Sequence, residues 1–208
     1  MASHETRARP NPTARRETQD GRRKRSDRSR KKIIDAMFDL LRDGDMHPSA
    51  VSVAARAGVG LRTVFRHFED MDTIYDEMAE AVMSAVLPKI IAPFEATDWH
   101  GRLDETLEKR ADIYETIFPV KVCMALRRFQ SDFLRKRYDQ DVALLRARLV
   151  AVVPEVVSNN KARFAALELA LSFSTWRRLR QDQNLSVIEA KRTVKLMLDA
   201  LTAGIDAA

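Results

Sequence analysis

The chain has 208 residues, of which 45% are hydrophobic and 32% charged, and its formal net charge is +6. This is the composition of an ordinary globular protein, long enough for one sizeable domain or for a medium domain with a small one. One cysteine excludes an internal disulfide, and no apolar run is long enough to span a membrane. The N-terminus has no apolar core of the secretory type, so we expect a cytoplasmic protein with no membrane partner.

The positive charge is concentrated at the N-terminus. Residues 1–25 hold eight Lys or Arg and three Asp or Glu, whereas residues 72–208 hold twenty of each. Because residues 1–25 have almost no large apolar side chain, they cannot bury enough surface to offset chain entropy, and we expect a disordered basic arm. The alternative is a solvated tail that only aids solubility. A run of four cations in this arm suits contact with phosphates, namely Arg22, Arg23, Lys24 and Arg25.

Gly and Pro divide the rest of the chain into segments of helical hydrophobic periodicity, without sustained alternation of the strand type. The sequence therefore predicts an all-α fold of about nine helices. Ser186 and Glu189 form a capping box at the start of the last helix. The expected helices are 26–43, 50–57, 61–67, about 70 or 72 to 87, 102–117, 120–129, 132–153, 159–181 and 186–203.

The segment AARAGVGLRTVFRHF, residues 54–68, breaks at its two glycines and restarts as a short amphipathic helix. At 100° per residue, four apolar side chains share one sector and four polar side chains share the opposite sector. A seven-residue helix is not stable alone, so we expect its apolar face to pack on the two preceding helices. The apolar set is Leu61, Val64, Phe65 and Phe68, and the polar set is Arg62, Thr63, Arg66 and His67.

This polar face fits DNA. The major groove of B-DNA admits one α-helix, Arg matches guanine O6 and N7, and Thr and His reach phosphate oxygens. Two short helices joined by a tight glycine-containing turn form a helix-turn-helix when the second is polar on its outer face. The segment therefore indicates a DNA-reading protein.

Residues 33–75 resemble the DNA-binding region of TetR-type transcriptional regulators. The shared features are the run AARAGV at 54–59, Thr63, an aromatic residue at position 65, His67-Phe68 and the following helix. The rest of the chain resembles the family only in length, helical content and order. The resemblance implies a three-helix DNA-binding domain over 26–74 and a ligand-binding and dimerisation domain over 75–208.

The resemblance also implies roles for single residues. Arg62 and Arg66 would face base edges or nearby phosphates, while Thr63 and His67 would anchor phosphates. Phe65 would lie against the backbone or a thymine methyl group.

Ser49, the expected N-cap of the second helix, would offer a hydroxyl to a phosphate. This chain departs from many family members, which have Tyr in place of Phe65, Lys in place of Met71 and often Ser in place of Gly60. Two phosphate contacts are therefore missing, and we expect the basic arm to offset them.

The C-terminal helices suit a dimer interface. Residues 163–180 are apolar on every side and so must be covered on every side, and the last helix carries an apolar stripe. The resemblance implies that two such helices from each subunit form a four-helix bundle, giving a homodimer on a palindromic operator. The alternative is the core of a monomer. The expected interface residues are Phe164, Leu167, Leu171, Trp176, Val194, Met197, Leu198 and Leu201.

The middle helices are rich in Met and aromatic residues. In the resembled family this region holds a pocket for a small-molecule effector, whose binding shifts the spacing of the two DNA-binding lobes. Such residues at helical spacing are more often plain core, and both interpretations stay open. The candidates are Met78, Phe94, Trp99, Tyr114, Phe118, Met124, Phe129 and Phe133.

Catalytic motifs are missing from the sequence. The four histidines are scattered, and there is no Glu-x-x-His pair, phosphate loop or nucleophile elbow. We therefore expect no enzyme, catalytic residue, metal or cofactor. The favoured function is a dimeric repressor, released from a palindromic operator by an apolar or amphipathic small molecule. Alternatives are an activator, a ligand-independent DNA-binding dimer, or a non-specific nucleic-acid binder driven by the basic arm.

Overall fold

The structure is a computed structural model that describes residues 12–205, with side chains described from residue 23. Within this range the chain folds into ten α-helices and one π-helical segment, without a strand, which confirms the all-α prediction. The chain divides into two compact units, Met1–Ile74 and Tyr75–Ala208. None of the described helices combines the length and the apolar character needed to cross a bilayer.

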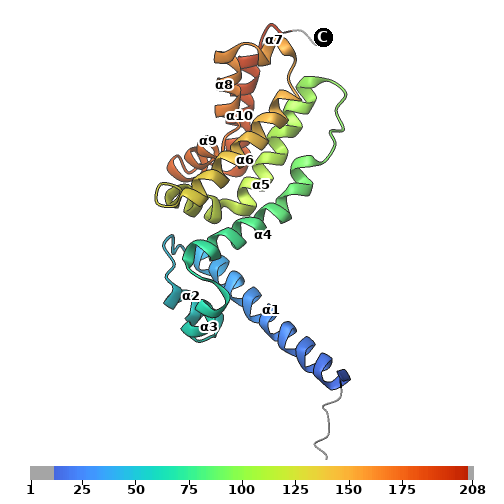
Figure 1. Ribbon diagram of the computed structural model, residues 1–208. Coiled ribbons are helices and arrows are strands. Elements are labelled where there is room, and N and C mark those ends of the chain that lie inside the picture. Colours follow the sequence, from blue (N-terminus) through green and yellow to red (C-terminus); the bar gives the residue numbers. More distant parts are fainter. Residues whose placement is uncertain (1–11, 206–208) are drawn as a thin grey trace, which may run out of the picture. The chain divides into compact units, whose positions relative to one another are not determined.

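The first unit comprises α1 (Pro12–Arg42), α2 (Ala50–Ala57), α3 (Leu61–His67) and the start of α4 (Met71–Ile91). The second continues with α5 (Trp99–Arg127), α6 (Asp132–Val150), α7 (Glu155–Ser158), α8 (Lys161–Ala170), α9 (Phe173–Arg177), the π-helical segment Arg178–Asp182 and α10 (Val187–Thr202). In the first unit, α2 and α3 pack beside α1 (Figure 1). The second unit is a bundle in which α5 contacts α6, α9 and α10, and α10 also contacts α8.

Helix α1 begins earlier than the sequence predicted. The expected disordered arm over 1–25 is helical from Pro12 onward, and the expected start at residue 26 is wrong. Residues 12–25 are rich in Arg, Lys, Glu and Gln, which have high helix propensity, and proline is favourable at a first helical position. Residues 1–11 and the side chain of Arg22 lie outside the described residues.

Two prolines that were expected to separate helices lie inside them. Pro88 is within α4, and Pro119 joins the expected helices 102–117 and 120–129 into α5. A proline inside a helix removes one hydrogen bond and costs about 3 kcal/mol. Apolar side chains at helical spacing continue across Pro119, and burying them offsets this cost. Ile113, Tyr114, Val120, Cys123 and Met124 are all buried.

The expected single helix over 159–181 is interrupted after α8. Ser172 caps a new helix by accepting a hydrogen bond from the Thr175 amide at 3.2 Å. The Leu171 carbonyl accepts hydrogen bonds from Arg110 Nη1 at 3.2 Å and from the Tyr114 hydroxyl at 3.0 Å. Side chains of α5 therefore bind the backbone where the helix was expected to continue.

The predicted helix caps are confirmed. The Ser49 hydroxyl accepts a hydrogen bond from the Ser52 amide at 3.1 Å, and the Ser52 hydroxyl accepts one from the Ser49 amide at 2.9 Å. Ser186 and Glu189 form the same reciprocal pair at the start of α10.

The turn between α2 and α3 depends on Gly58, whose φ of 64° is left-handed. The amides of Gly58 and Val59 donate to the carbonyls of Ala55 and Ala54, which is a Schellman termination. This hydrogen-bonding pattern ends α2 and sets the direction in which the chain enters α3.

We predict that Gly58→Ala destabilises the protein by about 1 kcal/mol, because a Cβ atom is strained at positive φ. Gly60→Ala is the matched control, since neither glycine has a heavy atom within 4 Å of an added Cβ and Gly60 has a φ of −71°. Its change should stay within about 0.5 kcal/mol. Urea unfolding followed by circular dichroism measures both, and equal effects would contradict this explanation of the turn.

Candidate nucleic-acid interface and internal cavity

Helix α3 is held by a narrower apolar stripe than predicted. Val64 and Phe68 are buried, with 0% and 1% of their surface exposed, whereas Leu61 and Phe65 are 41% and 51% exposed. The expectation that all four would pack inward is wrong for Leu61 and Phe65. A seven-residue helix that packs mainly on α1 and α2 buries chiefly the residues that lie one turn apart on its inner side.

The outer face of α3 therefore combines positive charge with the phenyl ring of Phe65. Leu61, Arg62, Phe65 and Arg66 are exposed and follow the spacing i, i+1, i+4 and i+5, which forms one stripe along the helix. Thr63 is half-buried at the edge of this stripe. The exposure of Phe65 fits the contact with backbone or thymine methyl that the family resemblance implied. Two guanidinium groups and a phenyl ring can together meet base edges and phosphates.

His67 lies differently from the other polar residues of α3. It is half-buried and its Nε2 atom is covered, so it does not share the open outer face that the sequence predicted. Its backbone carbonyl accepts a hydrogen bond from Arg30 Nη1 of α1 at 2.9 Å. The Arg30 guanidinium also lies 4.5 Å from the centroid of the Phe68 ring. A cation at the C-terminus of a helix is favourable, so Arg30 helps to hold α3 on α1.

Hydrogen bonds and an ion pair of neighbouring residues fix the start and end of the α2–α3 segment. Ser49 is exposed as the N-cap of α2, and Arg56 near the end of α2 pairs with Asp43 at 2.7 Å. After α3, the Asp70 carboxylate accepts hydrogen bonds from the Thr73 amide and hydroxyl, both at 2.8 Å. These hydrogen bonds, chiefly that from the amide, hold the pKa of Asp70 below its usual value. The exposed Arg23, Lys24 and Arg25 lie on α1.

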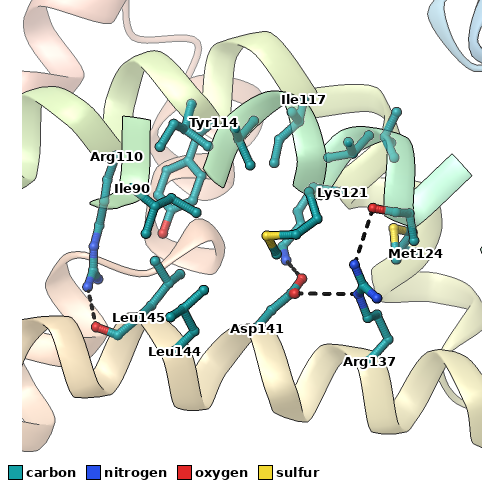
Figure 2. A pocket seen from close by; sticks show the side chains of 16 residues that line it. Ile90, Arg110, Tyr114, Ile117, Lys121, Met124, Arg137, Asp141, Leu144 and Leu145 are labelled. Carbon is teal, nitrogen blue, oxygen red and sulfur yellow. Dashed lines mark hydrogen bonds and ion pairs between the residues drawn. The ribbon is translucent and has the colours of Figure 1, made fainter. Parts of the chain in front are cut away.

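The second unit contains a cavity of about 50 Å³ between α4, α5 and α6 (Figure 2). Of the predicted pocket residues, Tyr114 and Met124 line it. Phe94 lines a smaller hollow, and Phe118 lines an open groove.

The other four predicted pocket residues line none of these three cavities. Met78 and Trp99 are buried in close packing. Phe129 and Phe133 are 80% and 39% exposed, because the end of α5 and the start of α6 turn them outward. Large apolar side chains mark burial in general and cannot by themselves distinguish a cavity from a filled core.

Charged side chains line the cavity together with the apolar ones. The Lys121 ammonium and the Asp141 carboxylate form an ion pair at 2.7 Å, and Arg137 Nε lies 3.9 Å from the same carboxylate (Figure 2). Arg110 is 6% exposed and donates to the Leu145 carbonyl at 2.7 Å. Burial lowers the pKa of the Arg110 guanidinium and raises the pKa of the Tyr114 hydroxyl. Among the described residues, no group of His, Cys, Asp and Glu is arranged to hold a metal ion.

Most of the predicted dimer-interface residues belong to the core of the second unit. Phe164, Leu167, Leu171, Trp176, Val194 and Leu198 are between 0% and 2% exposed, and Leu201 packs against the same core. They are covered by their own chain, so their assignment to an interface is wrong. Met197, at 37% exposed, is the remaining member. The apolar stripe of α10 packs inward on α5 and α8, which was the alternative considered from the sequence.

Comparison with solved structures finds the same architecture in other proteins. A transcriptional regulator from Rhodococcus sp. Rha1 aligns with a TM-score of 0.67 and 17% identity, over 88% of this chain and 97% of that chain. A candidate transcriptional regulator from Streptomyces coelicolor A3(2) aligns with a TM-score of 0.56 and 16% identity, over 81% and 97%. The chain shares their fold. No model of a known protein family matches the sequence, and no curated protein does.

Several charged residues that the sequence did not single out lie at the cavity in this fold. Arg110, Lys121 and Asp141 line the cavity, although only the aromatic and Met residues had been considered there. The signal was present in the sequence, since Lys121 lies between two valines in an apolar stretch of α5. A charge at such a position is costly unless it is paired or has a function.

We predict that Phe68→Ala lowers the free energy of unfolding by about 3–5 kcal/mol, because it opens a cavity under α3. Phe65→Ala, a matched change three residues earlier on the exposed face, should cost less than about 1 kcal/mol. Thermal and urea unfolding of the two variants would test this. Similar losses for both would show that Phe65 packs inward in solution.

Proposed function

We propose that this chain is a sequence-specific DNA-binding transcriptional regulator. The observation that carries the proposal is the exposed stripe of α3, in which Arg62, Phe65 and Arg66 face solvent while Val64 and Phe68 fix the helix on the first unit. A recognition helix must present long polar side chains in fixed positions, and buried anchors on its opposite side supply that rigidity.

Two further observations support the same function. The proteins that share the fold are described as transcriptional regulators, one of them as a candidate. The cluster Arg23, Lys24 and Arg25 is exposed on α1, where it adds positive charge suited to DNA phosphates. Thr63 and the hydroxyl of Ser49 would make further phosphate contacts, and His67 would act mainly by ending α3.

The regulator is proposed to act as a homodimer, because one recognition helix reads only a few base pairs. The outer faces of α8 and α10, which lie side by side (Figure 1), offer a surface for a second copy. Ala162, Ala165 and Leu169 of α8 are exposed, as are Ile188, Leu196 and Met197 of α10. Small residues allow close approach of helices, and large exposed apolar residues favour a covered surface.

Regulation is proposed to pass through the cavity of the second unit. Helix α4 contributes residues to the cavity wall and also contains the boundary between the two units. A ligand that binds one arrangement of α4 better than another would change DNA affinity by that difference. Release of a repressor is the simplest outcome, and activation by the same route is the second candidate.

We predict that Arg66→Ala weakens binding to the preferred DNA sequence by about 1–3 kcal/mol and relaxes the preference at one base pair. Arg42→Ala is the matched control, since Arg42 is also an exposed arginine but lies at the end of α1. Fluorescence anisotropy on a panel of single-base variants of the duplex measures both. An equal loss on every sequence would make Arg66 a phosphate contact only, and no loss would remove it from the interface.

We predict that Leu196→Glu shifts the protein from a dimer toward a monomer of 23.7 kDa. Leu196 is 70% exposed, so a charged residue there leaves the subunit fold intact and opposes burial against a second copy. Leu126→Glu, on the 50% exposed Leu126 of α5, is the control. Sedimentation equilibrium gives the mass of each variant. A dimer that persists in the Leu196 variant would move the interface away from α10.

A further inference from the structure

The cavity of the second unit has an excess of positive charge. Arg110, Lys121 and Arg137 line it against one carboxylate, that of Asp141 (Figure 2). Lys121 and Arg137 share this carboxylate at 2.7 and 3.9 Å. The side chains of Lys121, Arg137 and Asp141 are only 15–18% exposed, so water screens them weakly.

Arg110 is the lining cation that forms no ion pair with a described carboxylate. The charge of Glu168, which pairs with Arg146, only partly opposes the lowering of the Arg110 pKa by burial. Its guanidinium donates to the backbone carbonyls of Leu171 and Leu145, and none of the described carboxylates lies within ion-pair distance of it. Carbonyl oxygens satisfy the N–H groups but do not neutralise the charge. A buried cation of this kind is favourable only if another group compensates for it.

A second cavity, of about 100 Å³, lies directly beside the first. Arg110, Tyr114, Lys121, Asp141 and Leu145 line both cavities, so their side chains form the partition between them. The second cavity adds two cations, Arg128 and Arg146, and one acid, Glu168.

The added acid does not neutralise the two cavities. It belongs to Glu168, which already forms an ion pair with Arg146. The remaining added cation, Arg128, lies 3.9 Å from the centroid of the Tyr138 ring. The cations therefore outnumber the acids on both sides of the partition.

The rest of the wall is apolar. Helix α4 contributes Val82, Val86 and Ile90, and α5 contributes Ile113 and Ile117. A ligand that fits this lining must have an apolar body on one side and a negative group on the other. Cavities of 50 and 100 Å³ are smaller than those of most ligand sites, so binding requires side chains of the partition to move.

We propose that the cavity binds an amphipathic monocarboxylate, with its carboxylate between Lys121 and Arg110 and its apolar body along α4 and α5. This inference rests on the proposed effector-responsive function. The ligand carboxylate competes with Asp141 for Lys121 and supplies the direct ion pair that Arg110 does not form with any described carboxylate. Arg137 donates to the Ala79 carbonyl of α4 at 3.5 Å, so a change in this charge cluster acts directly on α4.

Isothermal titration calorimetry on the DNA-free protein tests the proposal with octanoate, octanol and octylamine, which share one apolar chain. Octanoate should bind at least about tenfold more tightly than the other two. A fourth probe, 4-phenylbutyrate, shows whether the apolar body is an acyl chain or an aromatic ring, and binding of either carboxylate supports the proposal. Equal or tighter binding of octanol or octylamine, or no binding of either carboxylate, would overturn it.

Three variants locate the carboxylate. Lys121→Met should weaken octanoate binding about tenfold, and Asp141→Asn should strengthen it, because a competing carboxylate is removed. Lys136→Met, on the exposed Lys136 of α6, is the matched control and should bind as the unmodified protein does. Weaker octanoate binding by the Asp141→Asn variant, or an equal loss of affinity in the Lys136→Met variant, would contradict this position of the carboxylate. Since the titration needs no DNA, a failure of DNA binding alone would count against the proposed function and leave this result standing.

Discussion

The burial of Val64 and Phe68 is the interaction on which the proposed interface depends. Helix α3 has seven residues, too few to form a stable helix alone, so its existence and its orientation come from packing on α1 and α2. The same packing directs Arg62 and Arg66 outward. Arg30 adds to it from α1, by binding the carbonyl at the end of α3 and lying over the Phe68 ring. The stability of α3 and its proposed DNA contacts therefore depend on opposite faces of one short helix.

Packing and the proposed effector site are linked in a comparable way in the second unit. Arg110 and Tyr114 of α5 donate hydrogen bonds to the carbonyl of Leu171, where the helix is interrupted between α8 and α9. The same two side chains line the cavity. A ligand that attracts Arg110 would compete with the contact that holds this break, so the cavity and the arrangement of the C-terminal helices are physically coupled.

The sequence predicted the all-α fold, the Ser49 cap and the bounds of α2 and α3, because hydrophobic periodicity and capping chemistry are local properties. The predictions from sequence failed where tertiary packing decides the structure. Pro119 lies inside α5 because apolar packing on both sides outweighs one lost hydrogen bond. Phe164 and Leu198 were assigned to a dimer interface, since a sequence shows that a face is buried but not which chain covers it. The charged residues of the cavity were missed for a related reason, as their significance depends on neighbours from three separate helices.

Selection of bound sequences from a random pool of duplex DNA, at roughly physiological salt, tests sequence-specific DNA binding most directly. We expect enrichment of a two-fold palindrome, which persists, with lower affinity, when Arg22, Arg23, Lys24 and Arg25 are changed to Ala. Enrichment of no sequence, together with binding that disappears in that variant, would contradict the proposed function. The protein would then be a non-specific nucleic-acid binder that depends on its basic N-terminal residues.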